Sequence, residues 1–418
     1  MSMVYRRDAK IAKGISLDLF RLITGTNQKT KSLRPLRLCG EIVVLISIFL
    51  LIWGCAGKKE TLKTGPQKSK FSIVVYPVEN LSGTRAPIQE MRQLFTEKSK
   101  QVGFDIPGEE ALEKFMEKNR IRYTGGLDRA TSKAFREQMG IEGVLIISVE
   151  FYSEDMPPKI ALISRLVSTG DEATVLWIDG IGMAGDDSPG LLSLGLVEDP
   201  RVLMNRAVRS LVESLVGWKD SKHLWRAKKR YQPKIAFRSP LLEIDKKLTV
   251  AVVPFFDISE RKYAGEIMVL HFVKQLTEFE NFEVLEPGIV RQELLNLRII
   301  MEDSISLAQT DVLFGILNVD LIAAGKVMDY QDYKSAWGKA KVDFSSQLIE
   351  RKSRQVVWSS RSYNDGEEAV YFFDWGKVNT AHVLTNRMVR SIGEMVVSGV
   401  PEEVPREEEE PVQPMIGY

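Results

Sequence analysis

The chain has 418 residues and a formal net charge of +1, with 44% hydrophobic and 27% charged residues. This length predicts two or three domains, and the composition is typical of a folded globular protein. A net charge so close to zero argues against a dedicated nucleic-acid-binding protein, which usually carries a strongly basic domain.

Cysteine and histidine, which supply the ligands of most zinc sites, are rare in this chain. Cys39 and Cys55 lie near the N-terminus, and the sequence after Cys55 contains no thiol. The three histidines, His223, His271 and His382, are far apart and show no ligand spacing. A disulfide in the bulk of the chain is therefore excluded, and the sequence predicts no metal site and no cofactor.

The N-terminal segment resembles the signal peptide of a bacterial lipoprotein. Residues 42–53 form an uncharged apolar run that is too short to span a bilayer as a helix, and two arginines precede it. Gly54 and Cys55 then match the lipobox, in which a small residue precedes a cysteine. The resemblance implies that residues 1–54 are a signal peptide with a long n-region. It also implies that Cys55 carries acyl groups such as palmitate, which hold the protein to a membrane.

Two other interpretations of this segment stay open. The apolar run is either a buried helix with an incidental cysteine or an uncleaved N-terminal anchor. Residues 55–69 are polar and are expected to form a flexible linker, which favours the lipoprotein interpretation.

The sequence after this linker contains an internal repeat of two similar copies. VLMNRAVRSL from Val202 and VLTNRMVRSI from Val383 are identical at seven of ten positions, 181 residues apart. A second pair, FSIVVYPVENLSG and LTVAVVPFFDISE, is 177 residues apart. Because the period is far longer than that of a solenoid, it indicates two whole domains. We therefore expect a first copy at residues 70–218 and a second copy at residues 247–399.

Each copy predicts the same order of elements. A short apolar strand comes first, at Ile73–Val78 in the first copy and at Val250–Phe256 in the second. An amphipathic helix, a second short strand, a helical pair, a longer strand, a two-stranded segment with a turn and the repeated helix follow. This order predicts an α/β (α+β) fold, with a mixed sheet and helices packed on it.

The pattern resembles a group of bacterial envelope domains that includes the N-terminal domain of TolB and the secretion lipoprotein CsgG. The matching segments are VVYPVENLSG and VAVVPFFDIS, EGVLIISVE and VDLIAAGKV, and SRLVSTGDEATVLW and SQLIERKSRQVVW. The resemblance implies a non-enzymatic protein-binding or assembly function at the outer membrane, facing the periplasm, with envelope proteins as partners. A secretion-pore subunit, a homo-oligomer, and a small-ligand binder or enzyme stay open as alternatives.

The repeated helix supplies candidate interaction residues. Its apolar stripe is expected to face the core of each copy. Its shared polar residues are Asn205, Arg206, Arg209 and Ser210 in the first copy and Asn386, Arg387, Arg390 and Ser391 in the second. The arginines either pair with carboxylates of their own domain or form a docking surface for the other copy or for a partner.

Residues 219–246 are expected to be a basic linker between the copies. Residues 219–238 contain eight Lys or Arg and one Asp, with Trp225 and Tyr231 between them. This composition predicts either a solvated linker or a contact with anionic lipid or glycan. Residues 400–418 contain six Glu and are expected to be a disordered tail that could pair with the linker.

One motif has the spacing of a dinucleotide site. Residues 180–185, GIGMAG, fit the pattern G-x-G-x-x-G, but Asp186 and Asp187 follow and would repel a phosphate. No helix pattern begins there, so we expect a turn or bulge with two solvated carboxylates. The sequence contains no P-loop, HExxH or GxSxG motif and predicts no catalytic residue.

Overall fold

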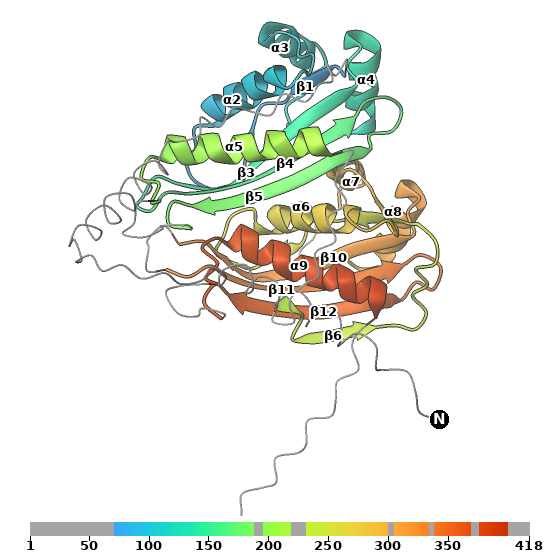
Figure 1. The fold of residues 1–418 in the computed structure, drawn as a ribbon. Coiled ribbons are helices and arrows are strands. Elements are labelled where there is room, and N and C mark those ends of the chain that lie inside the picture. Colours follow the sequence, from blue (N-terminus) through green and yellow to red (C-terminus); the bar gives the residue numbers. More distant parts are fainter. Residues whose placement is uncertain are drawn as a thin grey trace, which may run out of the picture. The chain divides into compact units, whose positions relative to one another are not determined.

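The computed structural model describes residues 71–187, 195–218, 231–299, 305–333, 338–368 and 376–399. These residues form two mixed sheets with helices packed on them, which confirms the expected α/β (α+β) fold class (Figure 1). The expected signal peptide, its linker and the acidic tail lie outside the described residues. The exact domain boundaries stay predictions.

The first copy contains the sheet order β1–β3–β4–β5, with β2 paired to β3. Strand β1 runs parallel to β3, whereas β3, β4 and β5 form an antiparallel meander. The elements are β1 (Ile73–Val75), β2 (Glu79–Asn80), α2 (Ile88–Gln101), α3 (Glu109–Lys118), α4 (Arg129–Met139), β3 (Gly143–Ser153), β4 (Lys159–Ser168), β5 (Val175–Ala184) and α5 (Pro200–Gly217).

The second copy repeats this topology with β7, β10, β11 and β12, and adds β6 and β9 at the two edges. Strand β6 belongs to the segment expected to be a linker, so the second sheet begins before that copy's predicted boundary. The elements are β6 (Ile235–Arg238), β7 (Leu248–Val252), β8 (Phe256–Asp257), α6 (Ala264–Thr277), β9 (Phe282–Val284), α7 (Pro287–Asn296), α8 (Leu307–Leu317), β10 (Leu321–Gln331), β11 (Lys341–Glu350), β12 (Val356–Asp365) and α9 (Ala381–Ser398).

A turn repeated in both copies explains one of the sequence matches. After β2, the side-chain oxygen of Asn80 accepts hydrogen bonds from the backbone N–H of Ser82 at 3.0 Å and from its hydroxyl at 2.6 Å. After β8, Asp257 accepts the same two bonds from Ser259 at 2.9 and 2.6 Å. Asn, Asp and Ser stabilise such turns because their short side chains reach the nearby backbone.

Both meanders contain a β-bulge at corresponding places. The register shifts between Val149 and Phe151 in the first copy and between Val327 and Asp329 in the second. A bulge inserts one extra residue and re-aims its side chain. In the first copy this extra residue is Glu150.

Two helices of the second copy lie between the two sheets. Helices α6 and α9 contact β10, β11 or β12 of their own sheet and also contact β5 of the first copy (Figure 1). One hydrophobic cluster likewise contains Val74 and Tyr76 of the first copy together with Ala251 and Val253 of the second. The described parts of the two copies therefore share a core.

The glycine motif corrects one expectation. Gly180 and Gly182 lie inside strand β5, and the turn begins only at Gly185, so the predicted turn or bulge is wrong for the first two. A Cβ atom at Gly180 would lie 2.6 Å from Cε1 of His382, and one at Gly182 would lie 2.4 Å from Oγ1 of Thr380. These glycines therefore allow the start of α9 to approach β5.

Candidate functional site

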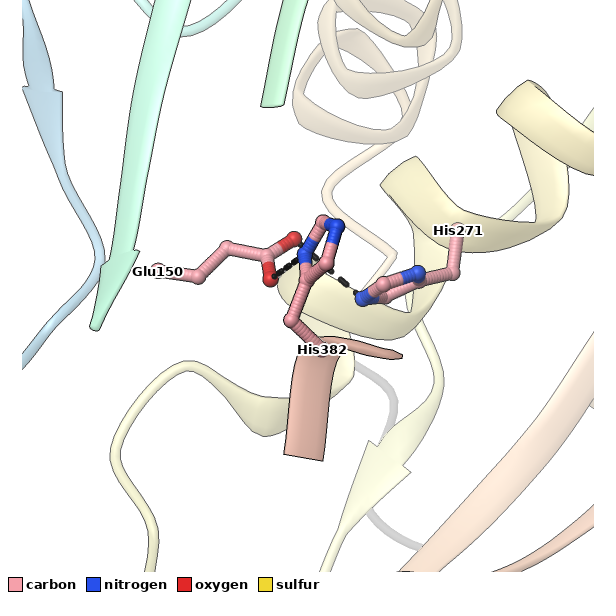
Figure 2. Close-up of side chains that lie close together, drawn as sticks. All are labelled: Glu150, His271 and His382. Atoms are coloured by element: carbon pink, nitrogen blue, oxygen red, sulfur yellow. Dashed lines mark hydrogen bonds and ion pairs between the residues drawn. The ribbon is translucent and has the colours of Figure 1, made fainter. Parts of the chain in front are cut away.

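Three buried titratable side chains meet where the two copies join (Figure 2). Glu150 comes from β3, His271 from α6 and His382 from α9, and each is exposed by 1% or less. Oε2 of Glu150 lies 2.6 Å from Nδ1 of His382, and Oε1 lies 3.3 Å from Nε2 of His271. We call these three residues the Glu–His cluster.

Local structure places each member of the Glu–His cluster. Glu150 is the extra residue of the bulge in β3. His271 lies in a helix that is buried around almost its whole circumference, because α6 is covered by both sheets. His382 lies in the first turn of α9, where the hydroxyl of Thr380 caps the helix by accepting from the N–H of Val383.

Asn386 joins the two imidazoles on the side away from Glu150. Its Nδ2 lies 2.8 Å from Nε2 of His382, and its Oδ1 lies 3.0 Å from Nδ1 of His271. Nε2 of Gln275 also donates to this Oδ1 at 3.3 Å. Each imidazole therefore contacts the carboxylate with one nitrogen and the amide with the other.

This arrangement fixes how many protons the two imidazoles share. Both nitrogens that face Glu150 must carry hydrogen, because a bare nitrogen would repel a carboxylate oxygen at these distances in a buried site. The amide of Asn386 offers one donor and one acceptor, so one nitrogen facing it carries hydrogen and the other does not. The count is the same if the amide is turned over. The two rings therefore carry three protons, and one imidazolium neutralises the carboxylate.

The electrostatics of Glu150 agree with this count. Burial disfavours the carboxylate, but the charges and hydrogen bonds of His271 and His382 outweigh burial and hold the pKa of Glu150 well below its usual range. Around the cluster, burial raises the pKa of Tyr330 and of Asp332, and the Glu150 charge raises both further. Only one carboxylate in this group is thus strongly favoured as an anion.

The Glu–His cluster also has the donor set of a zinc site, since its candidate ligand atoms all lie within 4.8 Å of one another. Its geometry does not fit a metal. Two ligands on a tetrahedral zinc, each about 2.0–2.1 Å from the ion, are about 3.3 Å apart, whereas Glu150 and His382 are 2.6 Å apart, as in a charge-assisted hydrogen bond. Metal-bound imidazoles would also both donate to Asn386, whose amide turns its NH₂ group toward one of them.

A second buried ion pair joins the copies. Nε of Arg165 lies 3.1 Å from Oε2 of Glu286, and its Nη2 lies 3.0 Å from Oε1, with both side chains fully buried. Nη2 also donates to the carbonyl of Gly125 at 2.6 Å. Glu286 in turn accepts from the N–H of Leu127 at 3.2 Å and from the N–H of Gly288 at 3.3 Å, and so begins α7. Among the described residues, Nε and Nη2 of Arg165 and both oxygens of Glu286 have hydrogen-bond partners, whereas the buried Nη1 of Arg165 has none.

Further hydrogen bonds surround these two ion pairs. Arg261 of the second copy donates to the backbone carbonyls of Ser82 and Glu150 in the first. Asp187, expected to be a solvated turn residue, accepts from Nδ2 of Asn379 at 2.9 Å. The same Nδ2 also donates to Asp186 at 3.4 Å, so both turn carboxylates contact the second copy.

The candidate arginines of the second copy bind within the chain. Nη1 of Arg387 donates to the hydroxyl of Tyr231 at 2.7 Å, and its guanidinium lies 5.3 Å from the centre of that ring. Arg390 pairs with Glu278 at 3.3 Å and with Glu394 at 3.4 Å. Tyr231 is only 5% exposed, so it does not offer an exposed aromatic surface to lipid or glycan.

The other candidates are not brought together. Arg206 is exposed and Arg209 is half-buried on α5. Trp225 and Cys55 lie outside the described residues. The apolar stripes of the repeated helix do face the core, as expected; their buried members include Met204, Val208, Leu211, Val212 and Leu215, and Leu384, Met388, Ile392 and Val396.

The expectation of scattered histidines is wrong for His271 and His382, which the fold brings together. One signal for this was present in the sequence. Glu150 interrupts the apolar strand VLIISVEFYS, and His271 interrupts the apolar run IMVLHFV. A titratable residue in a buried run requires a partner. The identity of that partner, however, depends on tertiary structure.

Comparisons with known proteins assign no family. No protein-family model and no curated protein matches the chain. The chain is similar to a PelC dodecamer from Paraburkholderia phytofirmans, with 15% identity over 38% of this chain and 96% of that chain, and a TM-score of 0.26. It is similar to lipoprotein GNA1162 from Neisseria meningitidis, with 19% identity over 34% and 98%, and a TM-score of 0.26. The LpoB C-terminal domain from Escherichia coli gives 13% identity over 28% and 86%, and a TM-score of 0.23.

Proposed function

We propose that this chain is a lipid-anchored protein of the bacterial envelope that acts without catalysis, as a binding or assembly module for envelope proteins. The observation that carries the proposal is the closed Glu–His cluster. A general acid or base must reach the proton of a substrate, but Glu150, His271 and His382 are exposed by 1% or less and face one another. Their physical effect is to join the copies.

The two copies then form one rigid unit. Domains in one chain usually move relative to each other unless their interface is large and apolar. Here a shared hydrophobic core is combined with two buried ion pairs, each formed between residues of different copies. A rigid unit holds its surfaces in a fixed relation, which suits an assembly role.

The proposed anchor rests on the lipobox resemblance at Cys55. Among the residues that the structure describes, none of the helices combines the length and apolar character needed to cross a membrane. Attachment through acyl groups on Cys55 would hold the folded unit at the membrane surface, facing the periplasm from the outer membrane.

Replacing Cys55 by serine is expected to release the protein from the membrane. Serine has no thiol to accept an acyl group, and a single mutation at the lipobox leaves the two copies unchanged. Fractionation of cells that express the full chain measures the effect. Cys39→Ser is the matched control and should stay with the membrane. Membrane retention of Cys55→Ser would contradict the proposed anchor.

Chemical crosslinking in native membranes tests the binding role. The tagged full chain should recover one or a few envelope proteins repeatedly, and Cys55→Ser should recover less of them, because the membrane no longer concentrates the chain beside its partners. Mass spectrometry identifies the recovered proteins. If the membrane-bound wild-type chain is crosslinked to itself alone, the heterologous assembly role is wrong and a homo-oligomer takes its place.

A further inference from the structure

A pocket of about 270 Å³ opens between the two copies, next to the ion pair of Arg165 and Glu286. Its walls are mostly apolar, and three charged side chains and two tyrosines complete it. The apolar residues include Leu81, Val252, Val269, Leu270 and Val290; the others are Glu79, Glu266, Arg291, Tyr123 and Tyr263. Mostly apolar walls with a few convergent polar groups are typical of small-ligand sites.

One side of the pocket carries two carboxylates. Glu79 lies in β2 of the first copy and accepts a hydrogen bond from the hydroxyl of Ser148 at 2.7 Å. Glu266 lies in the first turn of α6 and forms no hydrogen bond or ion pair with another described residue. Burial raises the pKa of Glu79, and the nearby charge of Glu266 raises it further. These two groups would both be stabilised by a cation placed between them.

The glycine beside Glu79 supports a built site. A Cβ atom at Gly125 would lie 1.7 Å from Oε1 of Glu79, so no other residue could stand there with the carboxylate in place. The carbonyl of Gly125 is at the same time held by Arg165. The backbone of the first copy is thus fixed in a position that leaves room for Glu79 at the pocket.

The opposite charge comes from Arg291 on α7. Its guanidinium lies 3.9 Å from the centre of the Tyr123 ring, which holds it by a cation–π contact. No ion pair joins Arg291 to a carboxylate in the described part of the chain. Stacking occupies the face of the guanidinium and leaves its N–H edges able to bind a carboxylate in bidentate geometry.

We propose that this pocket binds a small zwitterion with an apolar side chain, such as an α-amino acid. Its ammonium group lies between Glu79 and Glu266, its carboxylate binds Arg291, and its side chain packs on the apolar wall. A bare cation would leave that wall and Arg291 without a partner, and an anion would be repelled by the carboxylates. The site goes beyond the proposed assembly role and places a ligand at the junction of the copies.

Calorimetric titration of the full chain in detergent tests the site with L-leucine and L-phenylalanine. At least one of them should bind with a Kd below about 1 mM. Isoamylamine, which lacks the carboxylate, and 4-methylpentanoate, which lacks the ammonium group, should each bind at least about tenfold more weakly, since each loses the charge-assisted contacts at one end of the amino acid.

Two variants separate the site from nonspecific binding. Glu266→Gln and Arg291→Gln should each weaken amino-acid binding at least about tenfold, since each removes a charge-assisted hydrogen bond. Glu260→Gln and Arg136→Gln remove exposed charges outside the pocket and should leave the affinity unchanged. The proposal is overturned if neither amino acid binds, or if the pocket variants bind as tightly as the controls. Recovery of envelope partners does not depend on either result.

Discussion

Replacement of Arg165 by methionine is expected to lower the free energy of unfolding by about 3–5 kcal/mol. The carboxylate of Glu286 would stay fully buried, and only the N–H groups of Leu127 and Gly288 would face it. Methionine keeps much of the side-chain volume, so the loss reports the uncompensated charge rather than a cavity. Urea unfolding followed by tryptophan fluorescence measures it.

A second substitution distinguishes charge from packing. In the Arg165→Met background, Glu286→Gln should restore part of the lost stability, because the amide is neutral and still accepts from the backbone. Lys114→Met is the control, because it removes an exposed ion pair: the side chains of Lys114 and Glu110 are 73% and 80% exposed. This substitution should lower the free energy of unfolding by no more than about 0.5 kcal/mol. If Arg165→Met costs as little as this control, the ion pair does not hold the copies together.

Much of the fold could be predicted because its signals are local. Strands and helices produce a regular spacing of apolar residues in the sequence, and in a duplicated domain the same spacing occurs in both copies. The turns at Asn80–Ser82 and Asp257–Ser259 show that the same short polar pattern forms the same turn in both copies. The second short strand of the expected order is reduced to a single bridge between Ser72 and Asp105 in the first copy, because a short run depends on its neighbours for pairing.

The site could not be predicted because its contacts are long-range. Glu150 and His382 are 232 residues apart, and their meeting depends on a bulge, on the packing of α9 and on the absence of a side chain at Gly180. No periodicity encodes such a combination. The spacing of the glycines predicts a turn instead, because spacing alone does not distinguish a close helix approach from a reversal of the chain.

The sequence repeat also gives no indication of the Glu–His cluster. Asn205 and Asn386 match in the repeated helix, which suggested one shared role. However, the position 181 residues before His382 is Arg201, so the first copy lacks the imidazole that Asn386 contacts. The two copies share one scaffold, and only the second carries the histidines that contact Glu150 of the first.

Replacement of Glu150 by glutamine is expected to lower the free energy of unfolding at pH 7 by about 3–5 kcal/mol, because the imidazolium of the Glu–His cluster would lose its buried counter-ion. Glutamine has nearly the same shape, and one of the two imidazole N–H groups would face an NH₂ donor instead of an acceptor. Glu117→Gln removes an exposed carboxylate of the first copy and should change the free energy by less than about 0.5 kcal/mol.

The difference between the wild type and Glu150→Gln should also depend on pH. Folding lowers the pKa of Glu150, so its contribution to stability is fully present above the pKa of the unfolded carboxyl, about 4.3, and is lost as the pH falls through the lower pKa of the folded state. Urea unfolding at a series of pH values from 7 to acid should therefore show the two proteins converging in acid. A difference that persists in acid would mean that the ionised carboxylate of Glu150 is not the source of the stability.

Zinc should leave the unfolding midpoint of the wild type unchanged, because the cluster holds a proton where a metal would lie. Stabilisation by zinc that Glu150→Gln abolishes would mean that a metal and not a shared proton joins Glu150 to the two histidines.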